Sequence, residues 1–452
     1  MLTITPARNL QGKTDLPPDP DLFLLVTVVA LARRQPATIH AAPDLPVLRD
    51  WVRCLEEHMT FEWSDDGCTL RPATDDPPLR VALPSADLPW RDYIVFTLLG
   101  MGKTVVFPSI SPKRCEAWKK LAHRLGGCSL EFSPYGESTC IALSGETAQP
   151  RTEMPDESDI PALLGLLLGL GRSGVFTVSN PLVSPLRTIA PVFGFSIEVK
   201  SSAPKERDLL ARRLQLMQQK NKRATSQGQQ FSVAADFTTA VEPVDAPLSV
   251  TLPGDALCGI LLTEAKCLFP KNSLVIGNMP LESWAAPILP FIRKMGCKVS
   301  VQETGRTSFG SVGILHIQST GLTGRKTECI PASRYAASLP AMAVIAAFAR
   351  GESVFRELAD LRNDEPDGIE TIESCIRALG AHHGEMPDGI VLKGGRDFDG
   401  FDLERPFAAP CSGAFAIAGL KCTGKTTVND ELLSGRLPGF DALLKSICEP
   451  RT

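Results

Sequence analysis

At 452 residues, the chain is long enough to form two or three domains with well-buried cores. Its hydrophobic content of 43% and its charged content of 22% are typical of an ordinary soluble globular protein. The formal net charge of -4 gives no overall attraction for nucleic acid, which is therefore not expected as a partner.

Apolar runs and cysteines bear on where the protein works. The longest apolar runs, at residues 22–32 and 160–170, are about a dozen residues long, too short to span a bilayer. The first follows the acidic stretch DLPPDPD rather than a positively charged region, so a signal peptide is not expected. The 13 cysteines are scattered, without a Cys-x-x-Cys pair or a Cys/His cluster at metal spacing. This pattern favours reduced core thiols, a cytoplasmic protein and no metal.

One phrase recurs along the chain: a run of small apolar residues that predicts a buried helix, a Gly or Pro corner, and a short strand. It reads ALARRQPATIHAAP near residue 30, LLGMGKTVVFPSI near 100, LLGLGRSGVFTVSN near 170, AKCLFPKNSLVIGNMPL near 270, AAFARGESVFRELADL near 350 and AGLKCTGKTTVNDELL near 420. After most copies comes an amphipathic segment that closes on glycine, as in IETIESCIRALGAHHGE. Intervals of about 70 to 100 residues predict a repeated unit of strands and helices rather than a solenoid.

Residues 205–223 depart from this pattern. Seven Lys and Arg residues face only two acidic residues there, and Leu210, Leu214 and Met217 recur at helical spacing. The segment predicts an inserted basic amphipathic helix, followed by the polar linker ATSQGQQ. A solvated helix packed on the surface and a helix that binds nucleic acid or a partner are both open interpretations.

The last copy, GLKCTGKTTV at residues 419–428, has the spacing of a phosphate-binding P-loop. A P-loop needs a strand before the glycine-rich turn and a helix after it, because the helix N-terminus binds the phosphate. Here the order is reversed, since a small apolar helical run precedes the turn and the β-branched TTV follows it. We therefore predict a helix C-terminal turn, with Gly424 in the left-handed conformation and Lys425 near the negative helix end.

Six such units in two sets of three resemble the enolpyruvyl transferases, and five stretches resemble EPSP (5-enolpyruvylshikimate-3-phosphate) synthase in particular. These stretches are NPLVSPLRTIAPVFGFSIEV at 180–199, LPGD at 252–255, PAMAVIAAFARG at 340–351, LADLRNDEPDGIETIESCIRALGA at 358–381 and LPGFDALL at 437–444. The likeness covers essentially the whole chain, and the stretch at 358–381 is the most specific.

The resemblance implies an α/β fold of two globes, built from six βαβαββ-like repeats as an inside-out α/β barrel, with the active site in the cleft between the globes. The expected second globe is residues 1–12 plus 241–452, and the first is residues 13–240 with the basic insert. The implied reaction joins phosphoenolpyruvate to the 5-hydroxyl of shikimate 3-phosphate and releases phosphate. No cofactor and a monomeric protein are expected.

Both implied substrates carry several negative charges, so the chemistry needs Arg or Lys, preferably in bidentate geometry, and a positioned acid or base. Arg91 falls at the position of the Arg that ends a Gly-Thr turn in the family, and Arg114 at the Arg that binds phosphoenolpyruvate. The serines that hold the shikimate phosphate correspond to Ser158 and Ser184. Glu365 corresponds to the acidic residue of a Lys-Glu-Ser-Asp-Arg motif and is the predicted catalytic residue. The remaining candidates for substrate binding are Arg362, which flanks that motif, and Arg436, which lies nearest a late Lys of the family.

Several groups that the resemblance implies are absent, chiefly the Lys, Arg, Asp and His residues that handle charge and protons. The replacements are Pro20, Ala337, Asp364, Gly368, Gly435 and the stretch AAP at residues 408–410. Each lost charge-assisted contact costs about 1.5–3 kcal/mol, so five or six losses should abolish the family's reaction. Three hypotheses follow: a divergent EPSP synthase that uses Glu365, a non-catalytic homologue that senses a ligand or binds an active enzyme, and an enzyme for a less anionic cyclic substrate.

Overall fold

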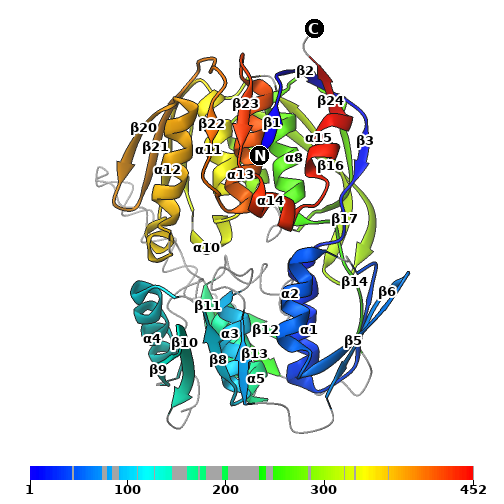
Figure 1. Cartoon of the computed structure of the whole chain (residues 1–452), viewed down its shortest axis with the longest axis vertical. Helices are drawn as coiled ribbons and strands as arrows, with labels where there is room; N and C mark the ends of the chain where they lie inside the picture. Colours follow the sequence, from blue (N-terminus) through cyan, green and yellow to red (C-terminus); the bar gives the residue numbers. More distant parts are fainter. Residues whose placement is uncertain are drawn as a thin grey trace, which may run out of the picture.

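Two lobes, each with its own hydrophobic core, make up the molecule (Figure 1). The computed structural model describes residues 1–42, 45–73, 79–83, 91–108, 110–126, 128–144, 160–171, 174–179, 196–201, 234–240, 248–282, 287–319, 321–329, 332–364 and 366–450. The basic insert expected at residues 205–223 lies outside these ranges.

Apolar helices occupy the centre of each lobe. They are α1 (Pro20–Arg33), α3 (Arg91–Gly100) and α5 (Ile160–Leu170) in the first lobe, and α8 (Ala256–Leu268), α11 (Leu339–Phe348) and α13 (Ala409–Lys421) in the second. Nearly every described residue of these helices is buried, because small and aliphatic side chains cover all sides rather than one stripe. The helices coincide with the six copies of the recurring phrase, so the predicted buried helices are confirmed.

The other helices are shorter or more amphipathic and lie farther out. They are α2 (Pro46–Leu55), α4 (Pro112–Gly126), α9 (Ile288–Lys294), α10 (Ala332–Tyr335), the 3-10 helix η2 (Ala359–Asn363), α12 (Gly368–Leu379), α14 (Glu431–Arg436) and α15 (Phe440–Ile447). In α12, the Asp367 side chain accepts the first backbone N–H groups, and Gly380 ends the helix with a φ of 79°. The predicted closure of this segment on glycine is therefore confirmed.

Four sheets share one topology. In each, the strand that follows a central helix pairs in parallel with one neighbour, and two antiparallel strands continue the sheet on its other side. The sheet orders are β14-β4-β6-β5, β7-β8-β10-β9, β3-β15-β17-β16 and β18-β19-β21-β20. Two smaller sheets, β11-β13-β12 and β1-β23-β22, take the corresponding places after α5 and α13. This repetition confirms the predicted unit of strands and helices.

The strands fall in two sets. Those of the first lobe are β4 (Ala37–His40), β5 (Met59–Ser64), β6 (Gly67–Pro72), β7 (Arg80–Ala82), β8 (Thr104–Phe107), β9 (Ser129–Tyr135), β10 (Ser138–Ser144), β11 (Gly174–Ser179), β12 (Ser196–Ser201), β13 (Ala234–Ala240) and β14 (Leu248–Thr251). Those of the second are β1 (Leu2–Ile4), β2 (Ala7–Leu10), β3 (Lys13–Asp15), β15 (Val275–Pro280), β16 (Cys297–Thr307), β17 (Gly310–Ser319), β18 (Lys326–Glu328), β19 (Gly351–Arg356), β20 (His382–Met386), β21 (Gly389–Gly394), β22 (Asp402–Leu403), β23 (Thr426–Val428) and β24 (Cys448–Pro450).

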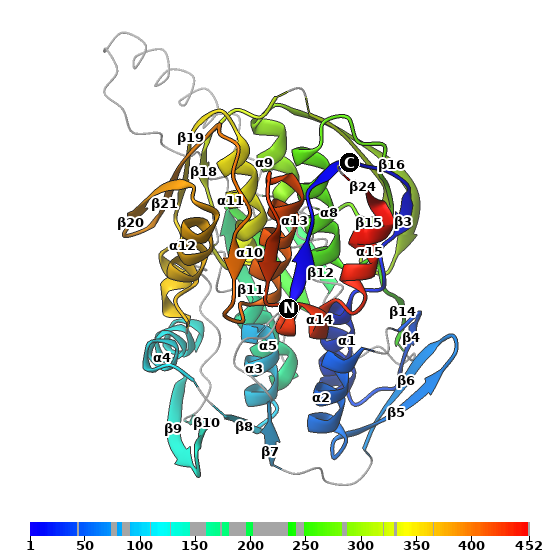
Figure 2. The ribbon, with the colours of Figure 1, turned by 45° about the horizontal axis from the view of Figure 1, so that its top comes forward.

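The first 15 residues belong with the second lobe. Strand β1 pairs with β23, β2 with β24 and β3 with β15, so the N-terminal segment runs beside the C-terminal elements (Figure 2). The chain then passes into the first lobe at α1 and leaves it again after β14, which still pairs with β4 of the first lobe. The two crossings lie side by side, since Pro18 and Gly254 form an antiparallel bridge and the N–H of Asp19 donates to the carbonyl of Pro253 at 3.0 Å. We propose residues 16–19 and 252–255 as the lobe boundaries, in place of the boundaries expected after residues 12 and 240.

The turn after α13 is not a P-loop. Helix α13 ends before the turn and strand β23 follows it, so the predicted order of helix and strand is confirmed. The predicted left-handed conformation of Gly424 is wrong, because the helix ends on an extended Cys422 and Gly424 has no positive φ. A Cβ on Gly424 would lie 2.9 Å from the backbone nitrogen of Gly400. Glycine is therefore required here by the close approach of another chain segment.

All 13 cysteines are free thiols, and all except Cys54, Cys115 and Cys448 are buried. This arrangement agrees with the predicted reduced core thiols. Among the described residues, no helix combines the length and the apolar character needed to cross a membrane.

Replacement of Gly254 tests the contact between the crossings. A Cβ at this position would lie 2.2 Å from the carbonyl oxygen of Asn278 and 2.6 Å from the Cβ of Leu16. Gly254→Ala should therefore lower the free energy of unfolding by about 1–3 kcal/mol, as overpacking does elsewhere. Urea unfolding followed by circular dichroism measures the change.

Gly435→Ala is the matched control, because a Cβ on Gly435 meets no atom within 4 Å. It should be neutral, or stabilising by up to about 1 kcal/mol in a helix. Equal losses in the two variants would contradict the steric argument.

Candidate functional site

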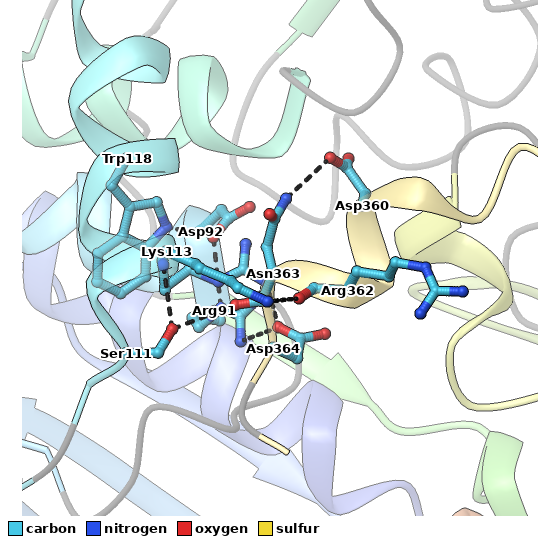
Figure 3. Close-up of polar contacts among 10 residues, drawn as sticks. Arg91, Asp92, Ser111, Lys113, Trp118, Asp360, Arg362, Asn363 and Asp364 are labelled. Atoms are coloured by element: carbon cyan, nitrogen blue, oxygen red, sulfur yellow. Dashed lines mark hydrogen bonds and ion pairs between the residues drawn. The ribbon is translucent and has the colours of Figure 1, made fainter. Parts of the chain in front are cut away.

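Two arginines of the first lobe meet one carboxylate of the second. Arg91 is the first residue of α3, Arg114 lies in the first turn of α4, and Asp364 follows η2. The Arg91 Nη1 atom lies 3.4 Å from Asp364 Oδ1, and Arg114 Nη2 contacts the same oxygen (Figure 3). The side chains of Arg91, Arg114 and Asp364 are 17%, 13% and 30% exposed, so this ion pair is intermediate between an exposed one and a buried one. We call these three residues the arginine–aspartate triad.

Helix α4 is fixed by a serine that touches both lobes. Ser111 Oγ accepts the backbone N–H of Arg114 at 3.1 Å, as an N-cap does, and donates to the carbonyl of Asn363 at 3.2 Å. Lys113 Nζ adds a bond of 3.4 Å to the carbonyl of Arg362. The start of α4 is therefore held against the end of η2 by backbone carbonyls as well as by the triad.

The guanidinium of Arg91 has a rigid support within the first lobe. Trp118, which is buried, donates from Nε1 to Asp92 Oδ1 at 2.8 Å. Asp92 Oδ1 also lies 3.5 Å from Arg91 Nε, and the Arg91 guanidinium lies 6.0 Å from the Trp118 ring centroid. The carboxylate and the ring orient the arginine while its Nη1 reaches Asp364.

Arg114 has donor capacity left over. Its Nε atom is buried and makes no hydrogen bond within the described part of the chain. A buried N–H without an acceptor is uncommon and costs about 1–3 kcal/mol, so such a group calls for an explanation. An anion bound beside Arg114 would supply the missing acceptor.

Arg362, the third arginine predicted to bind substrate, points away from the triad (Figure 3). Its Nη1 lies 3.2 Å from Asp367 Oδ2 and its Nη2 lies 2.7 Å from Glu385 Oε1. Its Nε and Nη2 also donate to the carbonyls of Pro387 and Met386. This side chain braces the hairpin of β20 and β21 against the start of α12, and the structure does not bring it together with Arg91 and Arg114.

Arg436 lies in a second cluster, at the chain crossings. Its Nη2 is 2.9 Å from Asp21 Oδ2, and its Nη1 contacts the fully buried Asp255. Burial by itself would lower the pKa of Arg436, but Asp21, Asp255 and Asp19 together raise it above the ordinary value. The guanidinium is therefore permanently charged and already neutralised by protein carboxylates.

Asp19 joins the two crossings. Its Oδ1 accepts the N–H groups of Asp21 and Leu22 at the start of α1, and its Oδ2 accepts the N–H of Ala256 at the start of α8. Burial, and then repulsion by Asp21 and Asp255, raise the pKa of Asp19 to about 8. Burial raises the pKa of Asp21 as well. The acidic stretch PDPD at residues 18–21 thus supplies a helix cap through Asp19, and the order Asp-Pro at a helix start is the sequence signal for such a cap.

Other predicted residues cannot be placed. Glu365, Ser158 and Ser184 lie outside the described residues, so their roles stay predictions. Sequence reasoning also missed Ser111, Asp92 and Trp118 as supports of the arginines. Ser111 precedes Pro112 at the start of α4, which is a recognisable cap signal. The contact of Trp118 with Asp92 joins two helices and has no local signal.

Within the described ranges, no group of three or more His, Cys, Asp or Glu side chains is placed to hold a metal ion. What the arrangement offers is therefore cationic: two supported guanidinium groups at the junction of the lobes. Such a pair can bind a carboxylate or a phosphate group.

Comparisons with known proteins agree with this architecture. The family model for EPSP synthase (3-phosphoshikimate 1-carboxyvinyltransferase) matches residues 227–440. A 3-phosphoshikimate 1-carboxyvinyltransferase of Desulforudis audaxviator is 26% identical over 99% of this chain and 99% of that protein. The chain resembles the EPSP synthases.

Further relatives and solved structures extend the likeness of this EPSP synthase-like protein. A 3-phosphoshikimate 1-carboxyvinyltransferase of Roseiflexus castenholzii is 31% identical over 45% of this chain and 47% of that protein. The EPSP synthase of Acinetobacter baumannii superimposes with a TM-score of 0.64 at 14% identity, covering 100% of this chain and 99% of that one. The enolpyruvyl transferase NikO of Streptomyces tendae gives 0.66 at 16% identity, covering 99% and 97%. At these identities the two structures establish the fold alone.

The raised pKa of Asp19 predicts a pH dependence of stability. Asp19 has an ordinary pKa of 3.8 when unfolded and about 8 when folded, so the folded state binds the extra proton between these values. The free energy of unfolding contributed by this group is therefore greatest below about pH 4 and falls as the pH rises toward 8. Asp19→Asn keeps a capping oxygen but does not titrate.

Thermal unfolding of the wild type and of Asp19→Asn between about pH 5 and pH 8.5 measures this effect. We expect the Tm of the wild type to fall more steeply with pH than that of the variant. Parallel curves would mean that the three backbone N–H donors and Arg436 keep Asp19 ionised throughout.

Proposed function

We propose that this EPSP synthase-like protein transfers an enolpyruvyl group, with Arg91 and Arg114 binding the anionic groups of phosphoenolpyruvate. The observation that carries the proposal is the convergence of these two arginines, from separate helices, on one carboxylate oxygen at the junction of the lobes. The buried Nε of Arg114 supports it, because this atom has no acceptor in the described part of the chain and a ligand oxygen would satisfy it. The similarity to 3-phosphoshikimate 1-carboxyvinyltransferases gives the reaction class.

In the proposed reaction, the acceptor hydroxyl adds to C2 of phosphoenolpyruvate while C3 takes up a proton. Loss of phosphate from C2 and of a proton from C3 then restores the double bond. Glu365 remains the proposed residue for these proton transfers. The atoms and electrons of this reaction balance without a cofactor. We also propose that the protein works as a cytoplasmic monomer.

The acceptor is proposed to be less anionic than shikimate 3-phosphate. By resemblance, Pro20 stands near a lysine that touches both substrates, and in this chain it lies between Asp19 and Asp21 at the start of α1. The nearest cation there, Arg436, is neutralised by Asp21 and Asp255. A missing lysine beside an arginine that is already paired disfavours a second multiply charged substrate, which supports a neutral or singly charged cyclic alcohol.

Phosphate release by the purified protein tests the reaction. It is measured with phosphoenolpyruvate and either shikimate 3-phosphate or unphosphorylated shikimate as the acceptor. We expect release with at least one acceptor and, if the acceptor site has lost its cations, a higher kcat/KM for unphosphorylated shikimate. Glu365→Gln should abolish turnover.

Arg114→Gln should lower kcat/KM by about 10- to 150-fold, since a charge-assisted hydrogen bond is worth about 1.5–3 kcal/mol. Lys120→Gln, which removes an exposed cation from the same helix, is the matched control and should change kcat/KM less than about twofold. No phosphate release with either acceptor would favour the non-catalytic homologue instead.

A further inference from the structure

The carboxylate of Asp364 lies where an anionic ligand of the two arginines would lie. It comes from the opposite lobe, and both guanidinium groups contact its single oxygen Oδ1. Each guanidinium has a fork of donors that matches two oxygens of a carboxylate or phosphate. At Arg114, one shared oxygen therefore leaves a donor of this fork without an acceptor among the described residues.

The incomplete use of donors is visible at Arg114. While Nη2 contacts Asp364, Nε stays buried and unpaired among the described residues. A free carboxylate or phosphate group could engage Nε and Nη2 together, which Asp364 does not do in this arrangement. The 30% exposure of the Asp364 side chain leaves solvent access to this ion pair.

The net charge around the two arginines depends on whether Asp364 is in contact with them. With the carboxylate in place, the described carboxylates that contact Arg91 and Arg114 are those of Asp364 and Asp92. If Asp364 moved away, the site would gain one further unit of positive charge. An incoming anion and Asp364 are therefore alternatives for the same guanidinium groups.

We propose that Asp364 is an internal competitor for the anion-binding pair, and that a ligand binds by displacing it from Arg91 and Arg114. The identity of the ligand as phosphoenolpyruvate rests on the proposed function, whereas the competition itself applies to any group with two or more anionic oxygens. Asp364 thus sets the specificity of the pair: it admits groups that bind both guanidinium forks, such as phosphate or carboxylate, and excludes weaker single-oxygen acceptors.

Displacement also affects the contact between the lobes. Besides the triad, Ser111 bonds the carbonyl of Asn363 and Lys113 bonds the carbonyl of Arg362. On the second lobe, Asp364 directly follows Asn363 and supplies the charged group of this contact. A ligand that releases Asp364 consequently weakens the contact of α4 with η2, so binding and lobe contact are coupled.

Isothermal titration calorimetry with inorganic phosphate and, separately, with phosphoenolpyruvate tests the competition. Asp364→Asn keeps the size of the side chain and removes its charge. We expect Asp364→Asn to bind both probes about tenfold more tightly than the wild type, corresponding to the loss of one competing charge-assisted contact. Arg114→Gln in the Asp364→Asn background should reverse the gain.

Asp360→Asn is the matched control. It removes an exposed negative charge from η2, and the Asp360 carboxylate accepts from Asn363 Nδ2 at 3.4 Å (Figure 3). Binding by this variant should stay within about twofold of the wild type, as for a distant surface charge. Equal gains in Asp360→Asn and Asp364→Asn would show a general charge effect and overturn the competition.

Unchanged or weaker binding by Asp364→Asn would overturn the proposal, because Asp364 would then serve to orient the arginines. Absence of binding of both probes by all variants would overturn it as well, since the pair would not be an anion site. Tighter phosphate binding by Asp364→Asn without any turnover in the phosphate-release assay would retain the competition and reject the proposed transferase function.

Discussion

The two chain crossings between the lobes are joined by one side chain, that of Asp19. One of its oxygens closes the N-terminus of α1 in the first lobe, and the other accepts the first N–H of α8 in the second. Helix starts leave backbone N–H groups unpaired, so one side chain that accepts three of them, two in α1 and one in α8, fixes where both helices begin. The paired crossings at Pro18 and Gly254 lie beside this carboxylate, and there is no room for a Cβ on Gly254.

The two charged clusters, one around Arg436 and one around Asp364, differ in burial and in how completely their donors are paired. At the crossings, three carboxylates surround Arg436, and burial with mutual repulsion raises the pKa of Asp19. At the start of α3 and α4, two arginines share Asp364. The first cluster is fixed by helix caps and buries its charges, whereas the second is partly exposed and leaves a donor unpaired. Of the two clusters, the second leaves Arg114 Nε without an acceptor among the described residues, which is why the proposed phosphoenolpyruvate site is placed there.

The repeated central helices were predictable because their signal is local. Small and aliphatic side chains that cover every side of a helix require burial on every side, and the Gly or Pro corner that follows marks where a strand begins. Lys425 and Gly424 show the limit of the same reasoning. The order of helix and strand followed from composition, but the reason for Gly424 is the approach of Gly400, a neighbour that a local pattern does not reveal.

In the candidate site, too, some features could be predicted from the sequence and others were decided by tertiary contacts. The resemblance to the family singled out Arg91 and Arg114, and it also marked the absence of a family cation at the position of Asp364. What the arginines contact was decided by tertiary structure: Arg362 turns to Asp367 and Glu385, Arg436 turns to Asp21 and Asp255, and Asp364 turns to Arg91 and Arg114. The sequence by itself determined the repeated elements and the types of charge available, because these depend on composition and periodicity. Only the folded chain decided which charges pair, because an ion pair depends on a few ångströms between residues hundreds of positions apart.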